Sequence, residues 1–330
     1  MILSDATAAA APAAALLQRA RRVLVLTHLN PDGDAIGSLL GMAHVLHALG
    51  KQVIAMAYPS LPQYVRWLPG AESIEIYRAG TTFPEVDLLV ITDTAAAHRL
   101  GPIWEDYAAV ITQLPMVVID HHLTNDGMGV VNLIDASASS TCELVYELLV
   151  ALALPIDAAT ATCLLMGLTT DTQSFQTSAT GARALRAAAA LIEQQADRAQ
   201  IVDSVYNALP AASALLIGRA LAEMHSEHGV SWTTVTHAMV RETGAEDAAA
   251  DEVVRVLQRV AEARALVLFK ERSDGTTKLS LRSRPPIDVA RFAQRWGGGG
   301  HAQASGATLQ MSPERAQAEV VPLLQSLVRG

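Results

Sequence analysis

The segment HLNPDGDAIGS (residues 28–38) places one histidine and two aspartates, His28, Asp32 and Asp34, directly after the apolar run VLVLT. A buried strand normally ends in a neutral turn, because clustered carboxylates repel one another. A bound cation would offset that repulsion. The segment therefore predicts a metal site at the end of a strand.

Acidic and histidine residues also follow other apolar runs. Asp93 comes directly after VDLLVIT, and Asp120, His121 and His122 come directly after MVVI. Asp171 lies in a threonine-rich turn after an apolar helix. Ligands of open parallel sheets bind beyond the carboxyl ends of the strands, so these side chains are expected to converge there. The predicted metal ligands are His28, Asp32, Asp34, Asp93, His121 and Asp171.

The types of these side chains indicate which chemistry to expect. Carboxylates with imidazoles and no thiolate suit Mn²⁺, with Mg²⁺ and Fe²⁺ as alternatives, better than a structural zinc. The six predicted ligands are more than one ion needs. Two ions about 3.5–4 Å apart that share a carboxylate would use all of them. Such a pair activates water and stabilises both oxygens of a phosphoryl displacement. The pattern therefore predicts phosphoryl hydrolysis.

Simpler explanations exist for each residue taken alone. Asp34, ahead of AIGSLL, could be only the N-cap of a helix. A single histidine in a turn is more often hydrogen-bonded than a metal ligand, and we interpret six others in this way: His44, His47, His98, His225, His228 and His237. The recurrence of acidic residues and histidines at successive strand ends favours the metal site.

The first half of the chain alternates apolar strands with helices. Expected strands cover residues 21–27, 51–58, 86–92, 116–120 and 129–135, and expected helices cover residues 35–49 and 139–154. Continuous β-branched runs separated by helices predict a parallel sheet covered on both faces. Further on, strands are expected at residues 231–240, 265–271 and 276–283, and helices at residues 287–296 and after Ser312.

Length and composition predict two domains. A chain of 330 residues, of which 51% are hydrophobic, is typical of a globular α/β protein with more than one core. We expect a parallel-sheet domain over residues 1–191, a helical linker over residues 192–215 and a smaller α/β domain over residues 216–330. Cys142 and Cys163 are expected to be buried free thiols.

Net charge and hydropathy limit the classes of molecule that the protein can be expected to bind. The formal net charge of −9 argues against a protein that coats long nucleic acid, but it allows a short anionic substrate held at one basic site. No apolar run approaches the roughly 20 residues of a membrane-spanning helix. The N-terminal segment lacks a basic region ahead of an apolar one, so we expect a cytoplasmic protein without a membrane partner.

Four motifs of this chain are HLNPDGDAIGS, ITDTA, VIDHH and TTDTQSF. They resemble the motifs of the DHH phosphoesterase superfamily, which is named for an Asp-His-His sequence, found here at residues 120–122. The segment GGGGHAQASGA is similar to the glycine-rich signature of the associated DHHA1 domain. The two-domain layout looks most like the NrnA-like oligoribonuclease and pAp phosphatase group, with the cyclic dinucleotide phosphodiesterases as close relatives.

The resemblance implies a role for each residue of the cluster. One Mn²⁺ would be held by His28, Asp32 and Asp93. The second would be held by Asp34, Asp93, His121 and Asp171, with Asp93 bridging the two ions. The catalytic candidates are Asp93, His122 and Asp120. His122 would contact the scissile phosphate with its ring turned away from the ions, and Asp120 would orient the neighbouring histidines.

The second domain is expected to select the substrate. A run of four glycines at residues 297–300 permits close backbone approach to a ligand. The planar guanidinium of arginine suits a terminal phosphate, and the resemblance implies that this domain holds the distal nucleotide. The candidate substrate contacts are Arg99, Arg282, Ser283, Arg284, Gly299, Gly300 and His301.

The resemblance implies a Mn²⁺-dependent phosphoesterase that acts on RNAs a few nucleotides long and on adenosine 3′,5′-bisphosphate (pAp). A cyclic di-AMP or linear dinucleotide phosphodiesterase is the alternative with the same chemistry. An inorganic pyrophosphatase is disfavoured by the GGGGH signature, and a RecJ-type exonuclease by the lack of extra nucleic-acid domains. An inactive nucleotide-binding regulator is disfavoured because every metal ligand is present. A homodimer remains an open alternative to a monomer.

Overall fold

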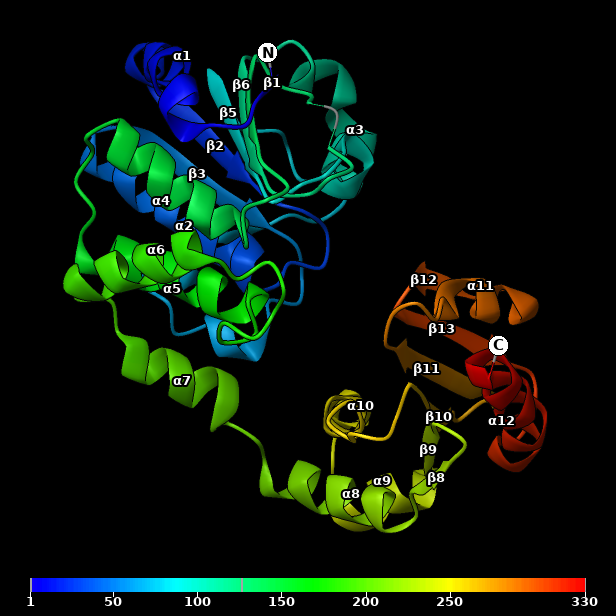
Figure 1. Ribbon diagram of the computed structural model, residues 1–330. Coiled ribbons are helices and arrows are strands. Elements are labelled where there is room, and N and C mark those ends of the chain that lie inside the picture. The colour runs from blue at the N-terminus through cyan, green and yellow to red at the C-terminus, as the bar shows by residue number, and fades with distance from the viewer. Residues whose placement is uncertain (1, 126, 330) are drawn as a thin grey trace. The chain divides into compact units, whose positions relative to one another are not determined.

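The computed structural model describes residues 2–125 and 127–329 and divides into two compact units, Met1–Ala208 and Leu209–Gly330 (Figure 1). The division falls inside the segment 192–215. The bounds given above for the parallel-sheet domain, the helical linker and the smaller α/β domain stay a prediction. Each unit has its own sheet and its own hydrophobic core.

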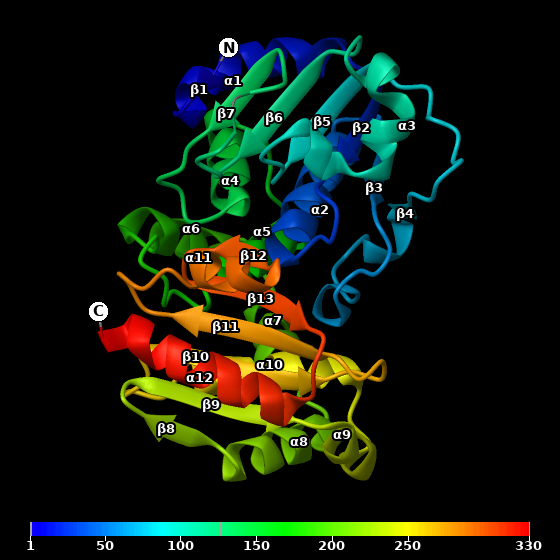
Figure 2. The same ribbon diagram turned by 90° about the vertical axis from the view of Figure 1, so that its right-hand side faces the viewer.

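The sheet of the first unit has seven strands in the order β1-β7-β6-β5-β2-β3-β4, and every pair is parallel (Figure 2). The strands are β1 (Ile2–Leu3), β2 (Arg22–Leu26), β3 (Gln52–Ala57), β4 (Glu75–Ile76), β5 (Leu88–Thr92), β6 (Met116–Asp120) and β7 (Val131–Ile134). The expected parallel α/β architecture is confirmed. The short edge strands β1 and β4 were not expected.

Helices cover both faces of this sheet. Successive strand residues point to opposite faces, and both faces carry buried apolar side chains. Val23 and Val25 of β2 pack with the core beneath α1, α2 and α4, whereas Leu24 and Leu26 pack with the core beneath α3. The helices are α1 (Ala6–Arg19), α2 (Gly33–Ala48), α3 (Pro102–Ile111), α4 (Thr141–Ala151), α5 (Ala158–Asp171), α6 (Ala182–Glu193) and α7 (Arg198–Tyr206). Both cysteines are buried free thiols, as expected.

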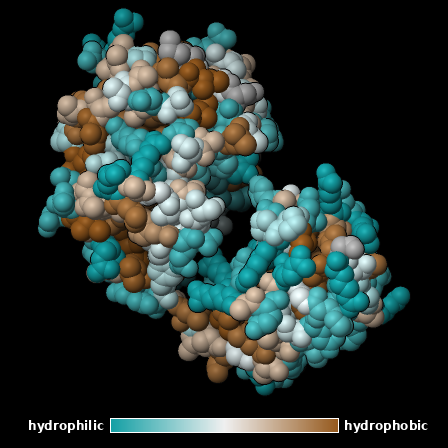
Figure 3. All heavy atoms as spheres, in the orientation of Figure 1, coloured by the Kyte–Doolittle hydropathy of each residue, from teal (hydrophilic) through white to brown (hydrophobic). Residues whose placement is uncertain are grey.

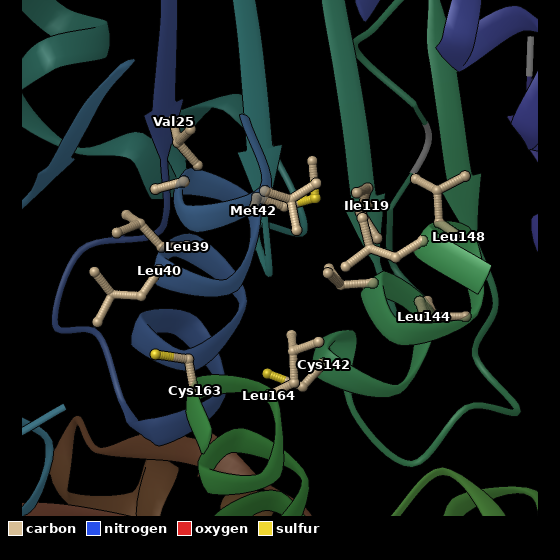
Figure 4. Packing of buried hydrophobic residues seen from close by; sticks show 14 of the residues in the cluster. Val25, Leu39, Leu40, Met42, Ile119, Cys142, Leu144, Leu148, Cys163 and Leu164 are labelled. Atoms are coloured by element: carbon tan, nitrogen blue, oxygen red, sulfur yellow. The ribbon is translucent and has the colours of Figure 1, made fainter. Parts of the chain in front are cut away.

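Helices α2 and α5 pack closely because glycines line the side of α2 that faces α5. Gly33, Gly37 and Gly41 recur every fourth residue, so they share one face of the helix. A Cβ at Gly33 would lie 2.4 Å from the Thr170 hydroxyl, and one at Gly37 would lie 2.4 Å from the main-chain oxygen of Cys163. The two helices run antiparallel, so the start of α2 meets the end of α5. Figure 4 shows buried side chains of α2, α4 and α5 in the core of the first unit, together with Val25 of β2 and Ile119 of β6.

The second unit has a six-stranded mixed sheet in the order β12-β13-β11-β10-β9-β8, in which only the described pair β9 and β10 is parallel. Its strands are β8 (His225–Glu227), β9 (Val230–Val235), β10 (Ala265–Glu271), β11 (Thr277–Ser283), β12 (Gly299–His301) and β13 (Ala304–Leu309). Its helices are α8 (Ala211–Ala222), α9 (His237–Thr243), α10 (Ala250–Leu257), α11 (Val289–Ala293) and α12 (Pro313–Arg329). Val267 and Phe269 of β10 pack toward α11 and α12, and Leu266 and Leu268 pack toward α8 and α10.

Two segments of the second unit differ from expectation. The strand expected over residues 231–240 ends at Val235, because the hydroxyl of Thr236 accepts a hydrogen bond from the Met239 N–H at 3.2 Å and begins α9. The glycine-rich segment after residue 296, for which no element was expected, forms strands β12 and β13, which pair antiparallel. Glycine has low strand propensity, so its composition gave no strand signal.

Among the described residues, no single helix is both long and apolar enough to cross a bilayer. Hydrophobic residues reach the surface in patches among hydrophilic ones on the face drawn in Figure 3. Such mixing is usual for protein surfaces.

Candidate metal centre

The acidic and histidine cluster consists of His28, Asp32, Asp34, Asp93, His121 and Asp171. It lies at the point in the first sheet where the strand order changes direction. From β2 the chain continues to β3 and β4 on one side, and β5 to β7 lie on the other side. β2 and β5 are neighbours, and their carboxyl ends lead directly into His28 and Asp93. Ligands of open α/β sheets bind at such switch points.

The start of α2 supplies two aspartates with different local roles. Asp32 is the N-cap, because its Oδ1 accepts hydrogen bonds from the N–H groups of Asp34 (3.0 Å) and Ala35 (3.1 Å). Asp34 is therefore not the cap that the simpler explanation assumed. Its carboxylate is buried and accepts hydrogen bonds from the N–H groups of Thr141 (2.6 Å) and Cys142 (2.9 Å).

His121 lies among three carboxylates. Its Nε2 is 3.4 Å from Asp171 Oδ2, 3.7 Å from Asp93 Oδ1 and 4.0 Å from Asp34 Oδ2. On the other side of Asp93, Oδ2 lies 3.4 Å from His28 Nε2. The carboxylate of Asp93 therefore faces a histidine with each of its oxygens.

The candidate ligands form three overlapping groups, within each of which the ligating atoms all lie within 4.8 Å of one another. The groups are His28 with Asp32 and Asp93, Asp34 with His121 and Asp171, and Asp93 with His121 and His122. The donors are carboxylate oxygens and imidazole nitrogens, which suit hard and borderline divalent cations. These groups could hold metal ions.

His122, a member of the third group, is paired with Asp120. His122 Nδ1 lies 2.8 Å from Asp120 Oδ1 and 3.7 Å from Asp93 Oδ1, so the ring stays next to the cluster instead of pointing away from it. Asp120 Oδ2 accepts a hydrogen bond from Asn125 Nδ2 at 2.6 Å, and Asn125 also donates to the Thr94 carbonyl. Asp120 is thereby held by Asn125 while it orients His122.

The electrostatics of the cluster favour a cation. Burial raises the pKa of Asp34, and the nearby carboxylates raise it further. Burial is also the largest cause that raises the pKa of Asp171, to about 7. Burial alone would raise the pKa of Asp93, but the hydrogen bond and charge of His28, with the charges of the other histidines, hold it below its usual value. The cluster thus holds several buried carboxylates whose negative charge the histidines only partly balance. Divalent cations would supply the missing positive charge.

Arg99 is the predicted substrate contact that lies in the same unit as the cluster. It belongs to a short 3-10 helix, Ala97–Leu100, and its side chain is exposed. Its main-chain oxygen accepts a hydrogen bond from the Leu29 N–H at 2.8 Å, which ties this loop to the one after β2. A hydrogen bond to Asp120 raises the pKa of His122. The positive charge of Arg99 is close enough to His122 to oppose this rise.

The other predicted substrate contacts lie in the second unit. The register places Arg282 opposite Ala304 and Ala304 opposite His301, so the arginine and the histidine share one row and one face of the sheet with a small residue between them. The Ser283 hydroxyl donates to the Ile287 carbonyl at 2.7 Å, and Arg284 donates to the Val260 carbonyl at 3.2 Å.

Two of the consecutive glycines approach the chain itself. A Cβ at Gly298 would lie 2.2 Å from the main-chain oxygen of Gly306, and one at Gly300 would lie 2.5 Å from that of Ala304. Both atoms belong to β13, so packing within the hairpin accounts for these glycines. Gly299 has open space around its Cβ position. Of the glycines predicted to contact substrate, Gly299 keeps free room on its Cβ side.

Two residues that contact the cluster were missed from the sequence. Thr141 donates its hydroxyl to Asp93 Oδ1 at 3.0 Å, and Asn125 holds Asp120. The only signal at Thr141 is the helix-start pattern around it, in which Ser140 is followed three residues later by Glu143.

Two family models match the chain. One, described as DHH family, N-terminal domain, matches residues 22–168, and the other, described as DHHA1 domain, matches residues 233–329. The first match contains the whole cluster except Asp171, and the second contains Arg282, Ser283, Arg284 and the glycine-rich hairpin.

The chain is 33% identical over 288 residues to the bifunctional oligoribonuclease and PAP phosphatase NrnA of Thermus thermophilus, covering 87% of this chain and 84% of that protein. It is 29% identical over 319 residues to the cyclic-di-AMP phosphodiesterase GdpP of Geobacillus thermodenitrificans, covering 89% of this chain but 45% of that protein. A solved structure of an exopolyphosphatase-related protein from Bacteroides fragilis has a TM-score of 0.88 at 24% identity and covers 98% of both chains. That likeness shows a shared fold.

Proposed function

The chain belongs to the DHH family and is a hydrolytic phosphoesterase, and from this premise we propose that it hydrolyses RNAs a few nucleotides long and pAp with two Mn²⁺ ions. The observation that carries the proposal is the cluster of carboxylates and imidazoles around Asp93 at the switch point of the first sheet. The 33% identity to an oligoribonuclease and PAP phosphatase supports the choice of substrate.

The geometry suggests how the ligands divide. His28, Asp32 and Asp93 would hold one ion, and Asp34, His121 and Asp171 the other, with Asp93 shared because each of its oxygens faces one group. Bound there, two divalent cations would lower the pKa of water toward about 7 and neutralise charge on the phosphoryl oxygens.

His122 and Arg99 would act on the phosphate itself. Nδ1 of His122 is engaged by Asp120, so we assign Nε2 to the substrate. The hydrogen bond to Asp120 raises the pKa of His122 and favours its protonated form, which can donate to a phosphate oxygen or to the leaving oxygen. Arg99, whose charge reaches His122, would add a second cationic contact to the same phosphate.

The proposal is tested by product analysis. Purified protein with Mn²⁺ is incubated with RNAs of increasing length, pAp, cyclic di-AMP, a linear dinucleotide and pyrophosphate. We expect the highest kcat/KM on dinucleotides to short oligonucleotides, clear release of phosphate from pAp, and steeply lower rates on long RNA. A higher rate on pyrophosphate than on dinucleotides contradicts the proposal.

A cyclic dinucleotide phosphodiesterase is the second candidate. It is favoured by the match to the cyclic-di-AMP phosphodiesterase, which covers 89% of this chain. It keeps the same metal chemistry and changes only the nucleotide. A kcat/KM on cyclic di-AMP above that on linear dinucleotides and pAp would favour this candidate over the first.

Metal affinity is expected to fall as the pH is lowered from about 8 to about 6. The pKa of Asp171 is raised to about 7 by burial, and a cation requires its ionised form. Below pH 7 the proton competes with the metal, and affinity should drop by about tenfold per pH unit for each proton displaced. Calorimetric titration with Mn²⁺ across this range measures the effect. An Asp171→Asn variant should bind Mn²⁺ more weakly with a flatter pH dependence; an unchanged slope would contradict the assignment.

A further inference from the structure

Thr141 contacts two of the candidate metal ligands at once. Its main-chain N–H donates to Asp34 Oδ2 at 2.6 Å, and its side-chain hydroxyl donates to Asp93 Oδ1 at 3.0 Å. The side chain is fully buried. Asp34 and Asp93 come from different elements, so this one residue connects the start of α2 to the end of β5.

The first turn of α4 holds Asp34 from both sides. The N–H of Thr141 reaches one carboxylate oxygen, and the N–H of Cys142 reaches the other at 2.9 Å. These N–H groups lie at the start of a helix, where they lack partners within the helix and where negative charge is stabilised. These two main-chain donors therefore fix the rotation of the Asp34 carboxylate. They remain in place when the Thr141 side chain is substituted.

The start of α4 is itself anchored. Ser140 caps the helix by accepting the Glu143 N–H at 3.1 Å, and Glu143 in turn accepts the Ser139 N–H at 2.8 Å. Arg183 of α6 lies 3.1 Å from Glu143 and also pairs with Asp135 and Glu147. These bonds keep the first turn of α4 in one place, so Thr141 is a fixed donor and not a mobile side chain.

The Thr141 hydroxyl also determines which way the Asp93 carboxylate faces. It binds Oδ1, the oxygen that lies 3.7 Å from His121, while Oδ2 lies 3.4 Å from His28. Without the hydroxyl, the carboxylate could rotate about its Cβ–Cγ bond and direct both oxygens differently. A bridging carboxylate needs one oxygen toward each ion.

From this geometry we propose that Thr141 is a positioning residue that sets the carboxylate of Asp93 to bridge the two metal ions. The inference rests on the proposed function, because it assumes that Asp93 binds metal. Thr141 acts through Asp93, as outer hydrogen-bond partners of metal ligands commonly do, and their loss typically costs about 10–100-fold in metal affinity or activity.

The test compares three variants of the full chain. Thr141→Val removes the hydroxyl at nearly constant shape, Thr141→Ser restores it, and Thr162→Val removes a buried hydroxyl of α5 that bonds instead to the Ala158 carbonyl and the Asp197 N–H. Mn²⁺ affinity and stoichiometry are measured by calorimetric titration, and the coupled Mn²⁺ pair by electron paramagnetic resonance.

We expect Thr141→Val to weaken Mn²⁺ binding about tenfold and to diminish the coupled-pair signal, Thr141→Ser to recover both, and Thr162→Val to change neither. Thr141→Val loses one buried hydrogen bond and Thr162→Val loses two, so both melting temperatures should fall. The metal readouts then separate the two variants. Wild-type metal binding in Thr141→Val, or equal weakening in Thr162→Val, overturns the inference and leaves the proposed function standing. A wild-type protein that binds no Mn²⁺ contradicts both.

Discussion

The Asp93→Asn variant is expected to lose about 10³-fold or more of its phosphoesterase activity while keeping its fold. Asp93 is the residue whose two oxygens face His28 and His121, 3.4 and 3.7 Å away, so both groups of ligands depend on it. The amide has the shape of the carboxylate but not its charge. It also cannot bridge two cations through two anionic oxygens.

This variant is assayed for turnover of a dinucleotide, for Mn²⁺ stoichiometry and for its circular dichroism spectrum. Asp157→Asn is the matched control, because Asp157 caps α5 by accepting the Thr160 N–H at 2.8 Å and asparagine is an equally good N-cap. The control should keep wild-type activity. Turnover within tenfold of wild type in Asp93→Asn would show that this carboxylate is not shared between ions.

The Gly167→Ala variant is expected to lose stability and to lose metal at the proposed site of Asp34, His121 and Asp171. A Cβ at Gly167 would lie 2.3 Å from Cys142 Sγ, 2.7 Å from Asp34 Oδ1 and 2.9 Å from Asp34 Cα. Asp34 must therefore move, or α5 must move away from it. Overpacking of this kind costs about 1–3 kcal/mol, against the gain of up to about 1 kcal/mol that Gly→Ala normally brings in a helix.

Melting temperature and Mn²⁺ stoichiometry measure this effect, and stoichiometry should fall from two ions toward one. Gly218→Ala is the control, since Gly218 lies inside α8 with no heavy atom within 4 Å of its Cβ position. That change should raise or maintain the melting temperature and leave metal binding untouched. A Gly167→Ala protein that binds two ions with wild-type affinity would contradict the role given to this close contact.

The strands that frame the cluster could be predicted because they are continuous apolar runs. β6 has the predicted bounds, Met116–Asp120, and β5 begins two residues inside its predicted range. The convergence of His28, Asp93 and His121 also followed from the sequence, since parallel strands present their carboxyl ends at one edge. The parallel α/β fold is confirmed on these grounds, and the metal roles of the residues stay a prediction.

Contacts made by packing could not be predicted in the same way. Thr141 meets Asp34 across 107 positions of sequence, a distance set by how α4 and α2 pack and not by any local pattern. The close approach of Gly298 and Gly300 to β13 likewise depends on how the hairpin folds, and the predicted contact of the glycine run with substrate stays a prediction. His122 was expected to turn away because it follows a ligand, but Asp120, fixed by Asn125, holds its ring beside the cluster.

The division of the chain has an evolutionary consequence. All side chains proposed to hold metal come from the unit Met1–Ala208, while the proposed nucleotide contacts other than His122 and Arg99 come from the unit Leu209–Gly330. On these assignments, substitutions in the second unit would change which nucleotide is bound and would leave the proposed metal ligands of the first unit untouched. Choice of nucleotide could then change in evolution separately from the hydrolytic chemistry.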